Sequence, residues 1–139
     1  PKILGEDAEY THLVATLASL YRERGQRKEA VYWSERAAAL APSDSNLALT
    51  SADYLLWAND IDRASRRIAD ILERHPNNFD ALVLAAIAGA RREDYAAALG
   101  YLERAHAITP SDPDVPIWEA NLKAKLGRKA VTGSKAEAL

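Results

Sequence analysis

The sequence predicts an all-α fold in which pairs of antiparallel helices stack as repeats. Equal intervals separate Pro42, Pro76 and Pro110, and each proline closes a similar phrase. A period of about 20 to 50 residues is typical of stacked-repeat proteins. The composition agrees, because the 28 alanines favour helix while the aromatic and β-branched residues that favour strands are sparse.

Counting back from the three prolines reveals two columns of alanine. At one fixed distance before the prolines stand Ala30, Ala64 and Ala98, and at twice that distance stand Ala18, Ala52 and Ala86. Two invariant columns in three copies indicate a true repeat. Small side chains at fixed positions let neighbouring helices approach closely, so we expect the columns to mark helix crossings.

Each unit contains the pattern of two helices. In the first unit, Val14, Leu17, Ala18 and Tyr21 form one helical stripe, and a second stripe begins at Ala30. Between the stripes, equivalent positions of the three units hold Gly25, Asn59 and Glu93, of which the first two tolerate a left-handed turn. The proline ends the second helix. The phrases SDSN, PNN and SDPD supply N-caps for the helix that follows.

These residues make the chain resemble the tetratricopeptide repeat family, whose unit is a helix–turn–helix of about 34 residues with small residues at the crossing and a closing proline. The first unit matches the family pattern best. In the second unit Ser51 replaces the expected leucine, and in the third unit Gly89 replaces a large residue. The resemblance implies a right-handed superhelical solenoid of antiparallel helix pairs, with about seven helices.

The same register predicts the boundaries of the units. We expect an N-terminal arm or linker over 1–8, repeats over 9–44, 45–78 and 79–112, a capping helix over 113–131 and a flexible tail over 132–139. Ala120 and Gly127 begin a fourth unit whose closing proline would fall beyond Leu139. Lys123 and Lys125 give this helix the polar outer face that a terminal repeat needs.

The composition argues against catalysis. The chain has no cysteine, which excludes thiolate catalysis, disulfides and cysteine-bound metals. His12, His75 and His106 lack the spacing of metal ligands, and no nucleotide-binding loop or nucleophile elbow is present. We therefore predict that the protein is not an enzyme and holds no metal or cofactor.

Charge and hydropathy restrict the partners. A net charge of −2 creates no strong field towards nucleic acid. The longest apolar run, residues 81–90, is too short to span a bilayer, so we expect neither nucleic-acid binding nor direct membrane insertion. The sequence fits the cytoplasm and the periplasm equally well.

The first helix of each unit carries side chains that packing does not require. In a stack of helical hairpins these residues line the inner, concave side. An apolar centre with a charged rim is typical of a groove that binds a peptide or helix. The predicted groove contains Leu49, Asp53, Leu56, Trp57, Asp80, Val83, Ile87, Arg91 and Asn121, with Trp57 and Arg91 as anchors. The alternatives are a register shifted by one residue and a groove filled by the chain's own arm.

The family resemblance also argues against one kind of ligand. Tetratricopeptide domains that clamp the C-terminal carboxylate of chaperones use lysines and asparagines on the groove helices. At the matching positions this sequence has Ala15, Ser19, Thr50, Asp80 and Leu84. The absence of a cation there, and the negative charge of Asp80, disfavour a carboxylate clamp.

These observations predict a protein–protein interaction module that binds a peptide or helix of another protein. One alternative is a structural spacer within a longer tetratricopeptide array of a bacterial envelope assembly or polysaccharide-export protein. Another is a domain that associates with itself, for example as a homodimer.

Overall fold

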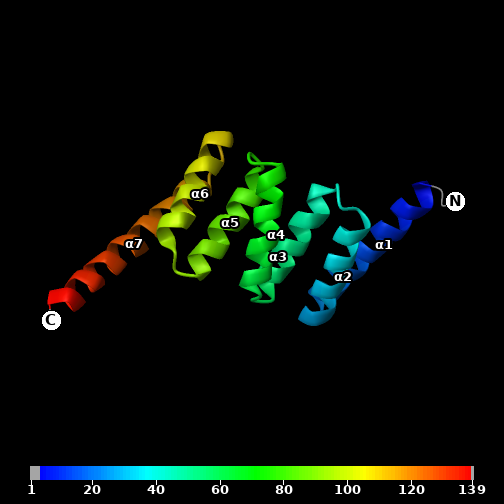
Figure 1. Cartoon of the computed structure of the whole chain (residues 1–139), viewed down its shortest axis with the longest axis horizontal. Coiled ribbons are helices and arrows are strands. Elements are labelled where there is room, and N and C mark those ends of the chain that lie inside the picture. The colour runs from blue at the N-terminus through cyan, green and yellow to red at the C-terminus, as the bar shows by residue number, and fades with distance from the viewer. Residues whose placement is uncertain (1–3, 139) are drawn as a thin grey trace. The chain divides into compact units, whose positions relative to one another are not determined.

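The computed structural model describes the backbone of residues 4–138 and the side chains of residues 8–128. The described backbone contains seven α-helices and no strand, which confirms the all-α prediction (Figure 1). The helices are α1 (Leu4–Glu23), α2 (Arg27–Leu40), α3 (Ser45–Trp57), α4 (Ile61–Arg74), α5 (Phe79–Arg91), α6 (Tyr95–Ile108) and α7 (Val115–Ala138).

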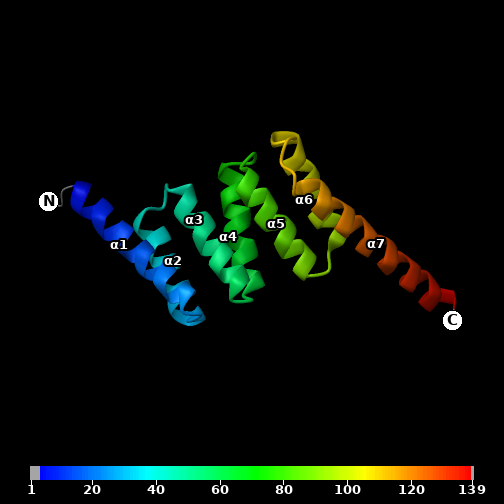
Figure 2. The same cartoon turned by 180° about the vertical axis from the view of Figure 1, so that it is seen from behind.

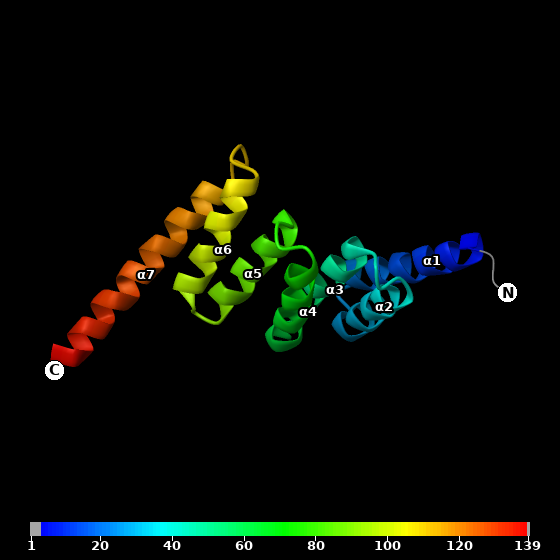
Figure 3. The same ribbon diagram turned by 45° about the horizontal axis from the view of Figure 1, so that its top comes forward.

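The chain forms two compact units, Pro1–Ile71 and Leu72–Leu139. In the first unit α2 packs against α1 and α3 packs against α2. In the second unit α6 packs against α5 and α7 packs against α6. Figures 1 and 2 show α1 and α2 running in opposite directions, and Figure 3 shows the same for α5 and α6. Each of these hairpins therefore consists of two antiparallel helices.

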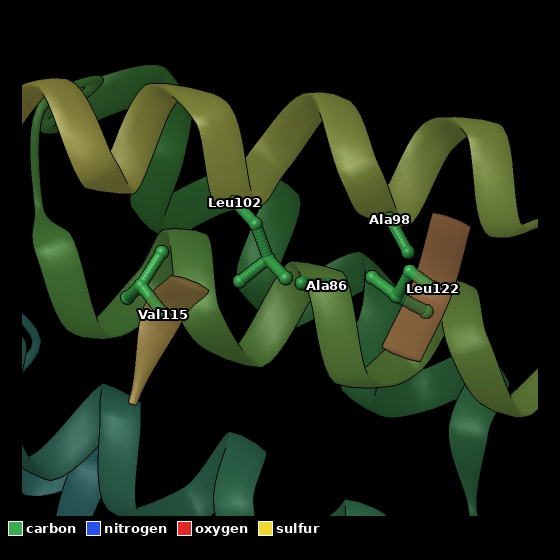
Figure 4. Packing of buried hydrophobic residues seen from close by; sticks show 5 residues of the cluster. All are labelled: Ala86, Ala98, Leu102, Val115 and Leu122. Carbon is green, nitrogen blue, oxygen red and sulfur yellow. The ribbon is translucent and has the colours of Figure 1, made fainter. Parts of the chain in front are cut away.

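The two alanine columns lie at the centre of the packing, as the sequence predicts. None of their six side chains exposes more than 4% of its surface: Ala18, Ala30, Ala52, Ala64, Ala86 and Ala98. In the second unit Ala86 and Ala98 pack with Leu102, Val115 and Leu122 (Figure 4). A methyl group at each crossing lets two helix backbones approach closely while larger residues fill the flanking space.

Gly89 shows how close the approach is in the second unit. A Cβ atom at this position would lie 3.3 Å from the Cβ of Ala98 and 3.4 Å from its backbone nitrogen. The equivalent residues of the earlier repeats are Tyr21 and Leu55. The glycine that departs from the family pattern therefore allows α5 to pack against α6 without moving Ala98.

The turns inside the three hairpins have the same hydrogen-bond pattern. Gln26 N–H donates to the Tyr21 carbonyl at 3.0 Å, Asp60 N–H to Leu55 at 2.8 Å and Asp94 N–H to Gly89 at 2.9 Å. The residue before each donor has a positive φ: 72° at Gly25, 65° at Asn59 and 61° at Glu93. This arrangement is the Schellman motif, which satisfies carbonyl groups at a helix C-terminus.

The N-caps also repeat. The Asp44 carboxylate accepts hydrogen bonds from the backbone N–H groups of Asn46 at 2.9 Å and Leu47 at 3.3 Å. It thereby caps the N-terminus of α3. Asn78 caps α5 by accepting from Ala81 N–H at 3.0 Å, and Asp112 accepts from Val115 N–H at 3.3 Å at the start of α7. All three caps stand at the same position after a repeat proline, which confirms the caps predicted from the sequence.

Two helices differ from the predicted boundaries. α1 begins at Leu4, within the segment predicted to be an arm, and α7 continues to Ala138, within the segment predicted to be a flexible tail. Gly127 occupies the column of the left-handed turn, yet it lies inside the α7 helix. The position that corresponds to Ala30, Ala64 and Ala98 is Thr132, so the sequence pattern of a second helix does not continue there.

Two substitutions of Glu93 should measure how much its left-handed backbone conformation lowers the stability of the fold, because both remove the same side-chain contacts. A left-handed conformation costs a non-glycine residue about 1 kcal/mol or more, so Glu93→Gly should be more stable than Glu93→Ala by roughly that amount. Urea denaturation measures the difference. Gly25→Ala is the matched control and should lose a similar amount. Equal stability of the two Glu93 variants would contradict the prediction.

Ser51 offers a second test, because its side chain is fully buried and its Oγ has no hydrogen-bond partner among the described residues. Ser51→Ala removes an unsatisfied polar group and should stabilise the fold by about 1 kcal/mol. Ser34, which is 2% exposed, donates to the Val31 carbonyl at 2.9 Å. Ser34→Ala should therefore give no such gain in the same denaturation experiment.

Candidate functional site

The residues of the predicted groove have different environments. Four lie on α3 in the first unit, and the others lie on α5 and α7 in the second. Leu49 exposes 8% of its surface and Leu56 only 2%. The prediction that these two leucines line an open groove is therefore wrong, because both are buried within the chain.

Asp53 and Trp57 interact with an arginine of the preceding helix pair. The Arg22 guanidinium lies 2.8 Å from the Asp53 carboxylate and 5.0 Å from the centre of the Trp57 ring. The same guanidinium lies 4.7 Å from the centre of the Tyr54 ring. A second guanidinium, that of Arg27, lies 5.7 Å from the centre of the Trp57 ring. Cation–π contacts of this kind hold an aromatic ring in place.

Trp57 therefore contributes to packing in the first unit. It is half-buried and contacts the buried cluster of Ala18, Ala30 and Tyr54. The anchoring role predicted for Trp57 stays a prediction, since these contacts leave the ring half-buried. The sequence pattern predicted Trp57 as an anchor of the groove on α3 but could not reveal these contacts from α1 and α2.

The second unit contains an open apolar pocket. It has a volume of about 290 Å³ and lies where α5, α6 and α7 meet. Three of the predicted groove residues, Val83, Ile87 and Asn121, line it together. The remaining lining residues are Ala86, Ala90, Leu102, Trp118, Leu122 and Lys125.

The pocket has an apolar floor and a partly polar rim. Leu102 and Leu122, which belong to the buried cluster of Figure 4, expose 2% and 7% of their surface. Ile87 and Trp118 are 38% and 39% exposed, so each presents a face to a bound molecule. The Lys125 ammonium lies 5.8 Å from the centre of the Tyr95 ring. This arrangement can receive an apolar side chain and offer a cation and an amide beside it.

Two lining residues were missed by sequence reasoning. Trp118 stands on the same stripe as Val115 and Leu122, which predicts burial, yet it is far more exposed than either of them. Lys125 fits the pattern of a polar outer face. Both line the pocket because α7 packs beside α6 and borders the space next to Ile87 and Ala90 of α5, which are not fully buried. No periodicity in the sequence encodes how these helices are placed.

Asp80 and Arg91 are exposed and do not line the pocket. Their spacing from Val83 and Ile87 is helical, so all four share one face of α5. Asp80 lies near the beginning of this helix and Arg91 at its end. The pocket therefore lies on a helix face with an acid at one end and a base at the other.

Neither a metal site nor a membrane segment is found in the described part of the chain. No group of three or more metal-binding side chains occurs among these residues. None of the helices searched combines the length and the apolar character that a membrane span requires.

Comparison with solved structures identifies the fold. The tetratricopeptide repeat domain of Arabidopsis OM64 has a TM-score of 0.76 and 15% identity, with 85% of this chain and 98% of that chain covered. The first such domain of Spaghetti (RPAP3), bound to the HSP90 peptide SRMEEVD, also has a TM-score of 0.76, at 13% identity and 84% and 93% coverage. The chain has the tetratricopeptide repeat fold.

A third similar structure is the tetratricopeptide repeat protein YrrB, described as having an unusual peptide-binding site. It has a TM-score of 0.73 and 24% identity, with 79% of this chain and 57% of that chain covered. No model of a known protein family matches the sequence, and no curated protein matches it either. Structural similarity therefore shows the tetratricopeptide repeat fold, and the proline and alanine register agrees with it.

Trp57 can be tested as a packing residue of this tetratricopeptide repeat fold. Trp57→Ala should lower the free energy of unfolding by about 2 kcal/mol, because it leaves a gap beside a buried cluster. Trp118→Ala, which truncates a more exposed ring, should cost less than about 1 kcal/mol. Thermal and urea denaturation measure both values. An unchanged stability of Trp57→Ala would show that its ring is not needed for packing.

Proposed function

We propose that this chain is a protein–protein interaction module that binds an apolar peptide or helix of another protein. The observation that carries the proposal is the open apolar pocket formed by α5, α6 and α7. A folded chain exposes Ile87 and Trp118 around one pocket only at a cost in free energy, since apolar surface favours contact with other apolar surface.

The size of the pocket suits a side chain rather than a cofactor. At about 290 Å³ it lies at the lower limit of small-molecule sites, which measure roughly 300 to 1,000 Å³. One large aliphatic or aromatic side chain would fill the space over Ala86 and Ala90. The neighbouring residues of the ligand would then extend along the exposed face of α5.

The charges around the pocket suggest an orientation for the ligand. Lys125 lies at the rim and Arg91 ends α5, whereas Asp80 stands in the first turn of this helix. A ligand with an acidic residue next to its apolar anchor would place that carboxylate near Lys125. A basic residue several positions away would suit Asp80, because opposite charges favour the correct orientation.

The similar structures support peptide binding as the class of function. The Spaghetti (RPAP3) domain binds an HSP90 peptide, and YrrB has a peptide-binding site. The chaperone-tail type of ligand fits less well here, because Asp80 stands where a carboxylate clamp needs a cation. The structural spacer predicted as an alternative stays a prediction.

The proposal can be tested with a displayed library of random dodecapeptides. Peptides would be selected on the wild-type chain and counter-selected on Ile87→Asp, which places a carboxylate in the pocket. We expect peptides with one large apolar residue and an adjacent acid. Their affinity, measured by fluorescence polarisation, should fall at least about 10-fold with Ile87→Asp and with Lys125→Glu.

Tyr32→Asp is the matched control, because Tyr32 is 58% exposed on α2 and lies in the other unit. It should bind the selected peptides as the wild type does, and circular dichroism should show that all variants are folded. Selected peptides that bind Ile87→Asp as tightly as the wild type would exclude this pocket as the site.

A further inference from the structure

The first unit contains a second hollow, which lies between α2 and α4 and is called the α2–α4 hollow below. It has a volume of about 500 Å³ and is lined by α2, by the end of α3 and by the beginning of α4. Its apolar lining residues are Val31, Tyr32, Leu55 and Ala58. Leu55 is fully buried and Val31 half-buried, whereas Tyr32 exposes 58% of its surface. The hollow thus combines buried apolar side chains with one exposed aromatic ring.

The exposed ring of Tyr32 is supported by its neighbour in the chain. Its centre lies 5.0 Å from the centre of the Trp33 ring, and the two planes meet at 87° in an edge-to-face contact. Trp33 packs in turn against a buried cluster of the first unit. The repeat itself does not require an aromatic residue here, since the equivalent residues are Arg66 and Gly100. Tyr32 is therefore a preformed contact surface that helix packing does not explain.

The carboxylates that line the α2–α4 hollow already have cationic partners. Arg63 pairs with Glu35, and another nitrogen of the same guanidinium lies 3.3 Å from the Asp60 carboxylate. The Arg67 guanidinium lies 4.0 Å from the Glu35 carboxylate. These ion pairs link α2 to α4 and neutralise the acidic side chains of the hollow.

Two cations of the α2–α4 hollow lack such a partner. Arg27 and Lys28 line the hollow and are exposed, and neither takes part in an ion pair among the described residues. Both stand in the first turn of α2, where the helix dipole disfavours positive charge. The equivalent residues of the second repeat are Ile61 and Asp62. Neither helix stability nor the repeat pattern therefore explains these two cations.

A smaller hollow continues along α4 from Arg63, which lines both. It has a volume of about 330 Å³, and its other lining residues are Arg66, Arg67 and Asp70. Arg66 is exposed and also takes part in no ion pair among the described residues. Together the two hollows carry five basic and three acidic side chains, a net charge of +2 in a chain whose net charge is −2. Positive charge is thus concentrated on this face of an acidic chain.

We propose that this face of α2 and α4 binds an acidic segment of a partner protein, with one large apolar side chain of that segment in the α2–α4 hollow. The apolar side chain contacts Tyr32 and Leu55, while carboxylates on either side of it meet Lys28 on α2 and Arg66 on α4. Charge complementarity selects an acidic partner. This site lies within the first unit, whereas the apolar pocket of α5, α6 and α7 lies in the second, so the two bind independently.

The lining residues favour a peptide over a nucleic acid or a small molecule. Glu35, Asp60 and Asp70 lie among the cations and would repel a continuous phosphate backbone, whereas a peptide can place its carboxylates at separate points. Single-stranded nucleic acids also require successive aromatic rings for stacking, and Tyr32 is the one aromatic side chain that lines either hollow. A small molecule in the α2–α4 hollow would leave the unpaired Arg66 without a contact.

The probe for the test is a fluorescein-labelled dodecapeptide with one central tryptophan and glutamates on both sides. Fluorescence polarisation measures its binding to the wild-type chain at about 25 mM and about 150 mM salt. The affinity should fall as salt rises, because the cations are exposed. Replacing the tryptophan by glycine should weaken binding at least about 5-fold, and replacing the glutamates by glutamines at least about 10-fold.

Variants of the chain locate the site. Lys28→Glu combined with Arg66→Glu should weaken binding at least about 10-fold, and Tyr32→Ala at least about 5-fold. Lys123→Glu combined with Arg128→Glu is the matched control, because it makes the same change of net charge at exposed positions of the second unit. At the higher salt concentration this control should bind the peptide as the wild type does. Circular dichroism should show that all variants are folded.

Ile87→Asp separates this site from the peptide pocket of the second unit. It should bind the acidic peptide as the wild type does, although it loses the peptides selected on that pocket. Conversely, Tyr32→Ala should keep the affinity for those selected peptides. Loss of one kind of binding is therefore measured independently of the other.

Four results would overturn the proposal. The first is no measurable binding of the tryptophan peptide at about 500 µM protein. The second is equal weakening by the two charge-reversed pairs, which would mean that only net charge matters. The third is loss of the acidic peptide in Ile87→Asp, which would place it in the pocket of the second unit. The fourth is a twelve-nucleotide oligothymidylate that binds this face more tightly than the peptide, which would make the ligand a nucleic acid.

Discussion

The close approach of antiparallel helices at the alanine columns is the constraint on which the rest of the structure depends. A single methyl group separates the backbones at each crossing, as the burial of Ala30, Ala64 and Ala98 demonstrates. Any larger side chain there would push the helices apart and open gaps around the flanking leucines and isoleucines. The left-handed turns and the Asp and Asn caps hold each helix in the register that this crossing requires. In the second unit Gly89 extends the same principle, since even a methyl group would press against Ala98.

Sequence reasoning predicted these features because each of them recurs at a fixed distance from a proline. The alanine columns, the turn residues and the caps are local requirements of the backbone, and three copies make them visible. The candidate site was predicted less well. Leu49 and Leu56 are buried, and Trp57 is held by Arg22 and Arg27, because burial depends on neighbouring helices as well as on the position within one helix. Val83, Ile87 and Asn121 do line one pocket. Trp118 was not predicted to line a pocket, since a helical stripe does not reveal how α7 is placed beside α5.

The pocket follows from the small residues that allow close packing. The small side chains of Ala86 and Ala90 leave a hollow beside α5, and Ile87 and Trp118 border this hollow. The same kind of residue that lets α6 approach α5 thus creates space where α7 only partly covers the helix. A ligand side chain would contact a surface whose shape is already set by the core, so little ordering would be needed on binding. A preformed surface of this kind would favour the proposed binding of an apolar segment.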